Sequence, residues 1–147
     1  MPLGNILGRG KCKLMAVRQT MVGSDRLEAV NDYIGEVTVA PGNDVVGRHW
    51  GTLRLGPAVS GTQIIPFTYT ASTLLVAGEY KGAMMSSTGG GVARMENNGK
   101  FILRGAFYYL PSSDPILKNF NFSRINASEG ILDTNENTLS WDVCEWS

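Results

Sequence analysis

Short apolar runs separated by glycine-containing segments are the dominant pattern along this chain. Such runs, bounded by turn residues, are typical of β-strands. No stretch with a helical period exceeds two turns, although residues 24–30 fit one helical turn capped by Ser24 or Asp25. The pattern predicts strands at residues 11–18, 33–39, 48–55, 64–70, 74–80, 82–86, 100–110 and 138–146. In the first of these, Cys12, Leu14 and Ala16 are expected to share one face.

Clusters of proline, glycine and asparagine separate these runs. Pro41-Gly42-Asn43-Asp44, Thr88-Gly89-Gly90-Gly91 and Asn97-Asn98-Gly99 have the residues that turns require, so we expect turns at all three. Residues 111–136 are long for a structureless loop. This segment contains either an edge strand near residues 120–125 or, over residues 111–137, a flap across the mouth of a barrel.

Large apolar residues occupy both faces of several predicted strands, as in Ile64-Ile65, Leu74-Leu75-Val76 and Phe107-Tyr108-Tyr109-Leu110. A sheet with one solvated face alternates more cleanly than this. We therefore expect an all-β fold, a closed antiparallel eight-stranded β-barrel with an apolar lumen, in a single domain of residues 1–147. Its outer face would be covered by neighbouring subunits. A buried sandwich strand explains the same residues and remains the alternative.

The charge balance and the apolar runs narrow the possible partners. Thirteen basic residues balance thirteen acidic ones and form no basic stripe, so no nucleic-acid partner is expected. No apolar run approaches the roughly 20 residues of a membrane span, and the apolar run at the N-terminus is too short for a signal peptide. We therefore expect no membrane partner and a cytoplasmic location. Cys12 and Cys144 are then either half-buried thiols or one bond between the first and last strands.

Common catalytic motifs are missing from the sequence. There is one histidine, His49, and no Cys-x-x-Cys, so a zinc site is not expected. No Gly-x-Ser-x-Gly, phosphate loop or dinucleotide fingerprint occurs, so we expect no metal and no cofactor. His49 is interpreted as a strand histidine at the edge of the barrel. The Gly-x-Trp signature of lipocalins is absent, since Arg48 and His49 precede Trp50.

The segment from Tyr33 to Leu110 carries a set of short glycine motifs: Val46-Gly47, Ser72-Thr73-Leu74-Leu75-Val76-Ala77-Gly78, Thr88-Gly89-Gly90 and Gly99-Lys100-Phe101-Ile102-Leu103-Arg104-Gly105. In these motifs the chain resembles the allene-oxide-cyclase-like barrel superfamily, which includes allene oxide cyclases, dirigent proteins and spirotetronate-type cyclases. The resemblance covers about half of the chain. It implies a barrel that binds an apolar small molecule, and assembly into a dimer or trimer.

Departures from the family pattern favour one branch of this superfamily. Allene oxide cyclases resemble the chain in the first strand but have a glutamate and an asparagine where Ala16 and Arg18 align, and a proline where Asp25 falls. Spirotetronate-type cyclases resemble it in length and in a tryptophan on the last strand, here Trp141. The resemblance therefore implies a cyclase in which aromatic residues of the cavity shape the substrate.

Strand aromatics are the candidates for substrate contact in the lumen. We predict this role for Tyr69, Tyr80, Tyr108 and Trp141, with Met84 and Met85 as adaptable wall, and plain core packing is the alternative for each. Glu36 and Glu79 are the strand carboxylates best placed for acid–base work, and Arg104 is the predicted catalytic donor. Arg54 and Arg94 are further donors. For all three arginines, an outward position in solvent or in an interface explains the sequence equally well.

A pericyclic ring closure needs no nucleophile and no metal, only a flexible substrate folded so that its reacting ends meet. Together with the lack of catalytic motifs, the resemblance implies a cofactor-independent cyclase of specialised metabolism that templates ring closure of a polyketide-like substrate, for instance by a pericyclic, Diels–Alder-type reaction. The alternatives are a non-catalytic, dirigent-like or ligand-binding barrel, and a structural oligomer with a filled core. A hydrophobic small molecule and further copies of the chain are the expected partners.

Overall fold

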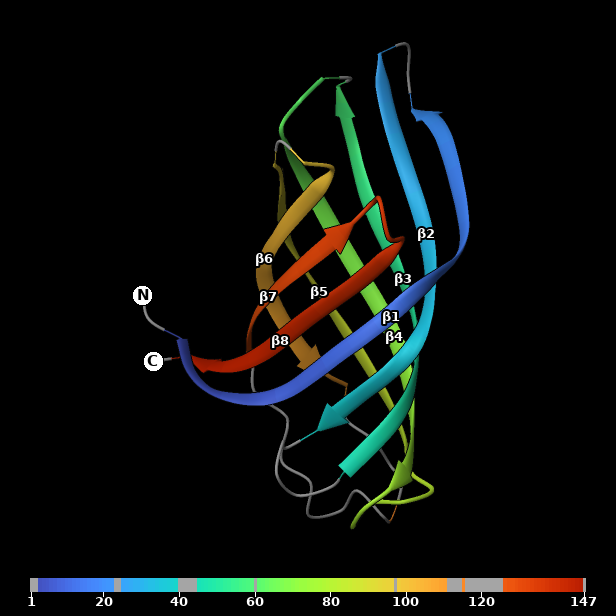
Figure 1. The fold of residues 1–147 in the computed structure, drawn as a ribbon, viewed down its shortest axis with the longest axis vertical. Helices are drawn as coiled ribbons and strands as arrows, with labels where there is room; N and C mark the ends of the chain where they lie inside the picture. The colour runs from blue at the N-terminus through green and yellow to red at the C-terminus, as the bar shows by residue number, and fades with distance from the viewer. Residues whose placement is uncertain are drawn as a thin grey trace.

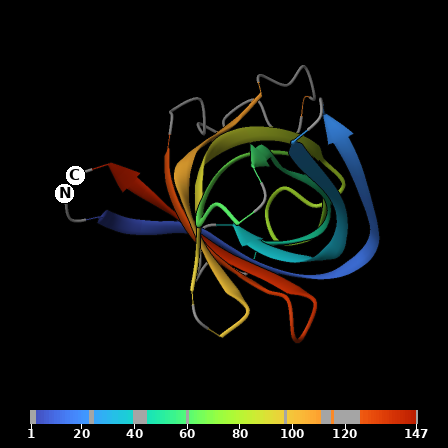
Figure 2. The same ribbon diagram turned by 90° about the horizontal axis from the view of Figure 1, so that it is seen from above.

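A single closed sheet makes up nearly all of the part of the chain that the structure describes. The structure, a computed structural model, describes residues 3–22, 25–39, 45–59, 61–96, 98–110, 115 and 126–146. Its eight strands are β1 (Leu3–Val22), β2 (Arg26–Val39), β3 (Val45–Val59), β4 (Ile64–Ala77), β5 (Met84–Met95), β6 (Lys100–Tyr109), β7 (Asn126–Asp133) and β8 (Thr138–Trp146) (Figure 1). Each strand pairs with its neighbour in chain order, and β8 closes the ring on β1 (Figure 2). The predicted eight-stranded antiparallel barrel is confirmed, and the sandwich alternative is wrong.

A bulge in β1 changes which of its residues face inward. The pairing of β1 with β2 shifts register between Leu14 and Ala16. Before the bulge Cys12 and Leu14 face the interior, whereas after it Val17 and Gln19 do. One inserted residue transfers every later side chain to the other face of a strand. The prediction that Ala16 shares a face with Cys12 and Leu14 is therefore wrong.

The strands are longer and more continuous than the sequence pattern suggests. β4 is one strand of 14 residues where two strands were expected. β5 runs through Thr88-Gly89-Gly90-Gly91, so the turn predicted there is wrong. A side chain at Gly91 would collide with the carbonyl oxygen of Arg104, which shows that this glycine lets β5 and β6 approach closely.

Other boundary predictions have mixed outcomes. Strands expected at residues 100–110 and 138–146 are confirmed as β6 and β8, while residues 26–30 belong to β2 and not to a helical turn. Residues 126–137 form β7 and the hairpin that follows, and not a flap. The turn predicted at residues 41–44, the edge strand at 120–125 and the rest of the flap lie outside the described residues. The described residues contain no helix with the length and apolar character needed to cross a membrane.

Packed side chains fill most of the barrel interior. The larger cluster, at mid-height, includes Cys12, Tyr33, Leu53, Phe67, Tyr69 and Phe107. A smaller one near the β4–β5 turn consists of Val37, Val45, Leu75, Ala83 and Met85. Trp141 packs against both clusters and joins them. The interior is open at the opposite end, where the connections β1–β2, β3–β4, β5–β6 and β7–β8 gather, at the upper end in Figure 1.

Candidate functional site

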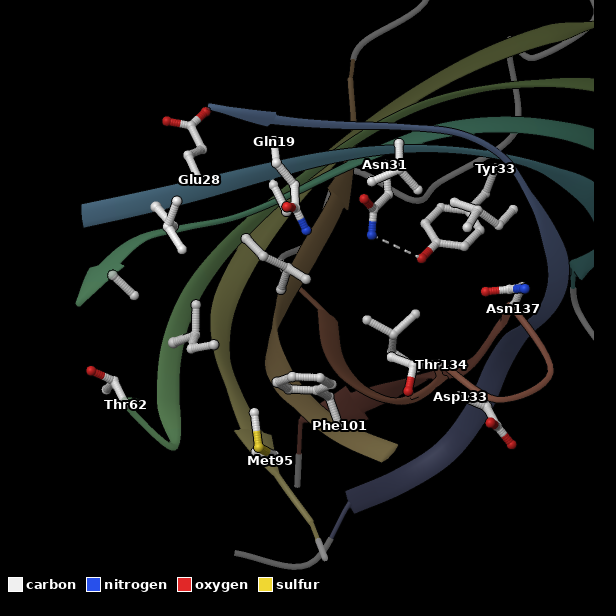
Figure 3. Close-up of a pocket in the computed structure, with 18 of the residues that line it drawn as sticks. Gln19, Glu28, Asn31, Tyr33, Thr62, Met95, Phe101, Asp133, Thr134 and Asn137 are labelled. Atoms are coloured by element: carbon white, nitrogen blue, oxygen red, sulfur yellow. Dashed lines mark hydrogen bonds between the residues drawn. The ribbon is translucent and has the colours of Figure 1, made fainter. Parts of the chain in front are cut away.

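A cavity of about 440 Å³ occupies this upper end of the barrel and opens to solvent. We call it the cup. Its wall is mostly apolar, with large side chains from five strands: Leu14, Val17, Leu27, Leu55, Ile65 and Phe101 (Figure 3). Small-molecule sites in proteins are concave, mostly apolar and about 300–1,000 Å³ in volume. The cup has the size and character of such a site.

Asn31 and Tyr33 place a polar pair in the apolar interior at the cup. Both belong to β2, two residues apart, so both side chains point inward. Asn31 Nδ2 donates a hydrogen bond of 3.3 Å to the Tyr33 hydroxyl (Figure 3). Burial raises the pKa of Tyr33, which keeps its hydroxyl protonated and neutral. Asn31 Oδ1 is buried and has no hydrogen-bond partner among the described residues.

Carboxylates lie where the cup meets solvent. Glu28 pairs with Arg54, whose Nη1 is 2.9 Å from Glu28 Oε1, and Asp133 lies 4.0 Å from the Lys100 ammonium. The two carboxylates line the cup, whereas their basic partners do not. Among the described lining residues no lysine, arginine or histidine occurs. The cup is therefore an apolar pocket with a rim whose own charges are negative.

Below the cup, four aromatic side chains from different strands pack against one another inside the barrel. We call His49, Tyr69, Phe107 and Trp141 the plug. The His49 ring centre lies 5.0 Å from that of Trp141 and 5.8 Å from that of Tyr69. The Phe107 ring centre lies 5.6 Å from that of Tyr69, with the two planes tilted by 39°. The rings fit because two facing residues have no side chain. A Cβ at Gly51 would collide with Tyr69 and one at Gly10 with Trp141.

Hydrogen bonds satisfy both nitrogens of His49 inside the plug. Nδ1 lies 2.8 Å from Thr73 Oγ1, and Nε2 lies 2.7 Å from the Tyr69 hydroxyl. Hydroxyl groups donate or accept, so either neutral tautomer is satisfied. Burial lowers the pKa of His49 to about 4, because the charged imidazolium loses its hydration there. His49 is thus a neutral core residue, and its predicted place at the barrel edge is wrong.

The two cysteines are separate buried thiols. Cys12 and Cys144 are both free, so the predicted alternative of a bond between the first and last strands is wrong. Burial raises the pKa of Cys12 to about 12. A thiol with such a pKa stays protonated at neutral pH, and neutral thiols are poor nucleophiles. Cys12 therefore contributes to core packing and not to chemistry.

The predicted lumen residues are divided between the two faces of the sheet. Tyr69, Met85 and Trp141 lie inside the barrel, and Tyr80 is half-buried beside the smaller cluster. Met84 and Tyr108 are 47% and 38% exposed on the outer face, so their predicted place in the lumen is wrong. Their strand neighbours point inward, and side chains alternate along a strand. All six residues are described, and none of them lines the cup.

The predicted catalytic residues lie outside the barrel and apart from one another. Glu36 is exposed on β2 and Glu79 in the β4–β5 turn. Arg104 is exposed and pairs with Glu129 at 3.3 Å, and Arg94 pairs with Glu96 at 3.0 Å. These positions match the alternative prediction that the arginines lie on the outside of the barrel. The structure therefore brings none of these groups to the cup.

The cup residues of β2 were missed because the strand was predicted to begin too late. Leu27, Ala29, Asn31 and Tyr33 alternate along the chain and all line the cup. This alternation was a usable signal for a strand starting near residue 26. The polar Asn31 within it marks a special position on an otherwise apolar inward row.

Comparisons with known proteins leave the family open. Neither a family model nor a curated protein nor a solved structure matches this chain. The resemblance to allene-oxide-cyclase-like barrels therefore stays a prediction from short motifs. Among the described residues no three His, Cys, Asp or Glu side chains cluster so as to hold a metal ion.

Proposed function

We propose that this protein binds a small, largely apolar organic molecule in the cup. The observation that carries the proposal is the cavity of about 440 Å³, open to solvent at one end and lined mainly by apolar side chains. Eight-stranded barrels either fill their interior with side chains or hold one small ligand. In this barrel, side chains fill the interior at the plug, and the cup leaves room for a small ligand.

The arrangement of wall and rim supports a ligand that enters lengthwise. Burial of apolar ligand surface against residues such as Leu14, Leu55 and Phe101 supplies the affinity. Polar residues where the cup opens, such as Gln19 and Thr62, suit the part of the ligand left in solvent. A mostly apolar pocket with few polar groups is the usual design of small-molecule sites.

Templated ring closure is a second candidate, because the cup is closed below by the plug. A flexible molecule longer than the cup has to fold back on itself, which brings distant parts of it together. Well-oriented reacting groups gain on the order of 7–11 kcal/mol from proximity in favourable systems. A pericyclic closure exchanges π bonds for σ bonds within one molecule and needs neither a leaving group nor an oxidant. In this candidate Glu36, Glu79 and Arg104 take no part, since they lie on the outside.

Fluorescence of a neutral apolar dye, N-phenyl-naphthylamine, tests binding. Ala29 lies on the cup wall, so Ala29→Phe places a ring inside the cavity. Thr70→Phe places the same ring on the outer face of β4 and is the matched control. We expect dye fluorescence to rise with wild type and with Thr70→Phe, and to fall at least severalfold with Ala29→Phe. Equal dye binding by the two variants refutes the cup as the site.

Turnover of a linear polyene with a diene and a dienophile tests ring closure. We expect a cyclic isomer of unchanged mass to accumulate beyond one equivalent per protein, and to do so more slowly with Ala29→Phe than with Thr70→Phe. Dye displacement by the polyene without any rate increase refutes the cyclase and leaves binding intact. Cytoplasmic location and assembly into a homo-oligomer stay predictions from the sequence.

A further inference from the structure

One buried polar atom at the cup lacks the partner that protein interiors normally provide. Asn31 is 8% exposed, and its Oδ1 accepts no hydrogen bond from any described residue. More than nine in ten buried polar groups in proteins have a partner. Its other amide atom, Nδ2, already donates to the Tyr33 hydroxyl. The amide oxygen is therefore an unused acceptor.

This acceptor belongs to a residue of the cup wall, but Oδ1 itself is shielded from solvent and has to turn toward the cavity to meet a ligand. Asn31 lines the cup opposite Val17 on β1, and most other lining side chains, such as Leu14 and Leu55, carry no donor. In Figure 3 the Asn31 and Tyr33 side chains point together into the barrel. The last torsion of an asparagine side chain is soft, so the amide can turn its oxygen toward a molecule in the cup.

The charges around the cup restrict what that molecule is. Glu28 and Asp133 are its ionisable carboxylates, and the basic partners of both stand outside the lining. Tyr33 stays protonated because burial raises its pKa. An anionic head group would lose its hydration in the apolar interior and find no cation there, which is unfavourable. The cup therefore discriminates against carboxylates and phosphates.

We propose that the cup selects a neutral molecule with an apolar body and an alcohol hydroxyl, which enters first and donates to Asn31 Oδ1. The proposal rests on the proposed function and adds the chemical class of the ligand. A hydroxyl both donates and accepts, so it also matches the polar pair, which has Asn31 Oδ1 as acceptor and the Tyr33 hydroxyl as donor.

Competition between three related molecules tests this choice. Octanol, its isomer heptyl methyl ether and octanoate are each titrated against N-phenyl-naphthylamine bound to the wild-type protein. Octanol is expected to displace the dye at about tenfold lower concentration than the ether, because one net hydrogen bond contributes roughly a factor of ten. Octanoate at neutral pH is expected to be the weakest competitor.

Asn31→Leu removes the acceptor by replacing the amide with an apolar side chain. With this variant we expect octanol and the ether to compete equally. Gln19→Leu makes a similar change at another polar lining residue, and should keep the tenfold preference. Equal competition in wild type, or octanoate as the strongest competitor, overturns the inference while dye binding keeps the proposed function. Absence of dye binding overturns both. Should Asn31→Leu fail to fold, the wild-type series alone decides.

Discussion

The plug makes the stability of the barrel depend on pH through His49. Its folded pKa, about 4, lies below the ordinary value of 6.5. Between these values the unfolded chain binds a proton that the folded protein excludes. The contribution of His49 to the free energy of unfolding is therefore fully present above pH 6.5 and decreases as the pH drops toward 4.

The magnitude follows from the shift. Each pH unit inside this window removes about 1.4 kcal/mol from the free energy of unfolding. From about pH 7.5 to about pH 4.5, His49 alone should lower that free energy by about 2.5 kcal/mol. This is a large part of the 5–15 kcal/mol by which typical domains are stable.

Urea denaturation of wild type and of His49→Asn at both pH values measures this contribution. Asparagine does not titrate, and it retains a donor and an acceptor for Thr73 and Tyr69. Carboxylates change protonation equally in both proteins. The difference between their pH dependences therefore isolates His49, even where the variant is less stable at every pH.

Equal pH dependence in the two proteins would refute the reasoning. It would mean that the imidazole takes up its proton as readily in the folded protein as in the unfolded chain. The contacts of His49 with Thr73 and Tyr69 would then not exclude the charged form. A proton NMR titration of the single histidine gives its folded pKa directly and provides an independent check.

Further variants test the plug, the core and the cup. Tyr69→Phe should lower the free energy of unfolding by about 1–3 kcal/mol in urea, because His49 Nε2 loses its partner. Gly10→Ala should lower the melting temperature by several degrees, since the new methyl group collides with the Trp141 ring. Cys12 should react with a thiol reagent only at the rate of unfolding, because its thiol is buried and protonated. Asn31→Leu should change the stability of the ligand-free protein in urea less than Tyr69→Phe does, because removal of the unsatisfied acceptor Oδ1 offsets loss of the Nδ2 hydrogen bond to Tyr33.

The closed antiparallel barrel was predictable, because apolar runs and turn residues recur along the chain in the period of strands. The strand count agrees only because two errors cancel: β4 was expected as two strands, and β7 was expected to be part of a loop or flap. Which side chains face inward was less predictable. The bulge after Leu14 in β1 leaves no sign in the sequence. In β6, apolar residues at consecutive positions do not reveal that Tyr109 is more buried than Tyr108. The run Thr88-Gly89-Gly90-Gly91 has the composition of a turn, yet β6 needs those glycines for close approach. Only the paired backbone distinguishes these uses of glycine.

The site was harder to predict than the fold because its residues meet only on closure. Tyr69 and Trp141 are distant in sequence, and whether they bound a cavity or fill one depends on Gly10 and Gly51 opposite them. With glycine at both positions the rings turn inward and fill the middle of the barrel. The hollow is thereby displaced to the upper end, where smaller residues such as Ala29 face inward.

The plug and the cup differ in whether their buried polar groups have hydrogen-bond partners. In the plug, both nitrogens of His49 have partners, as expected for a polar group that only has to be buried. Asn31, on the wall of the cup, lacks a partner for its oxygen. A buried acceptor without a partner costs about 1–3 kcal/mol. An unsatisfied acceptor is unfavourable in an empty cup and becomes favourable once a ligand supplies a donor. Because Asn31 Oδ1 belongs to the wall of the large open cavity described in the barrel interior, it supports the proposal of a ligand that carries this donor.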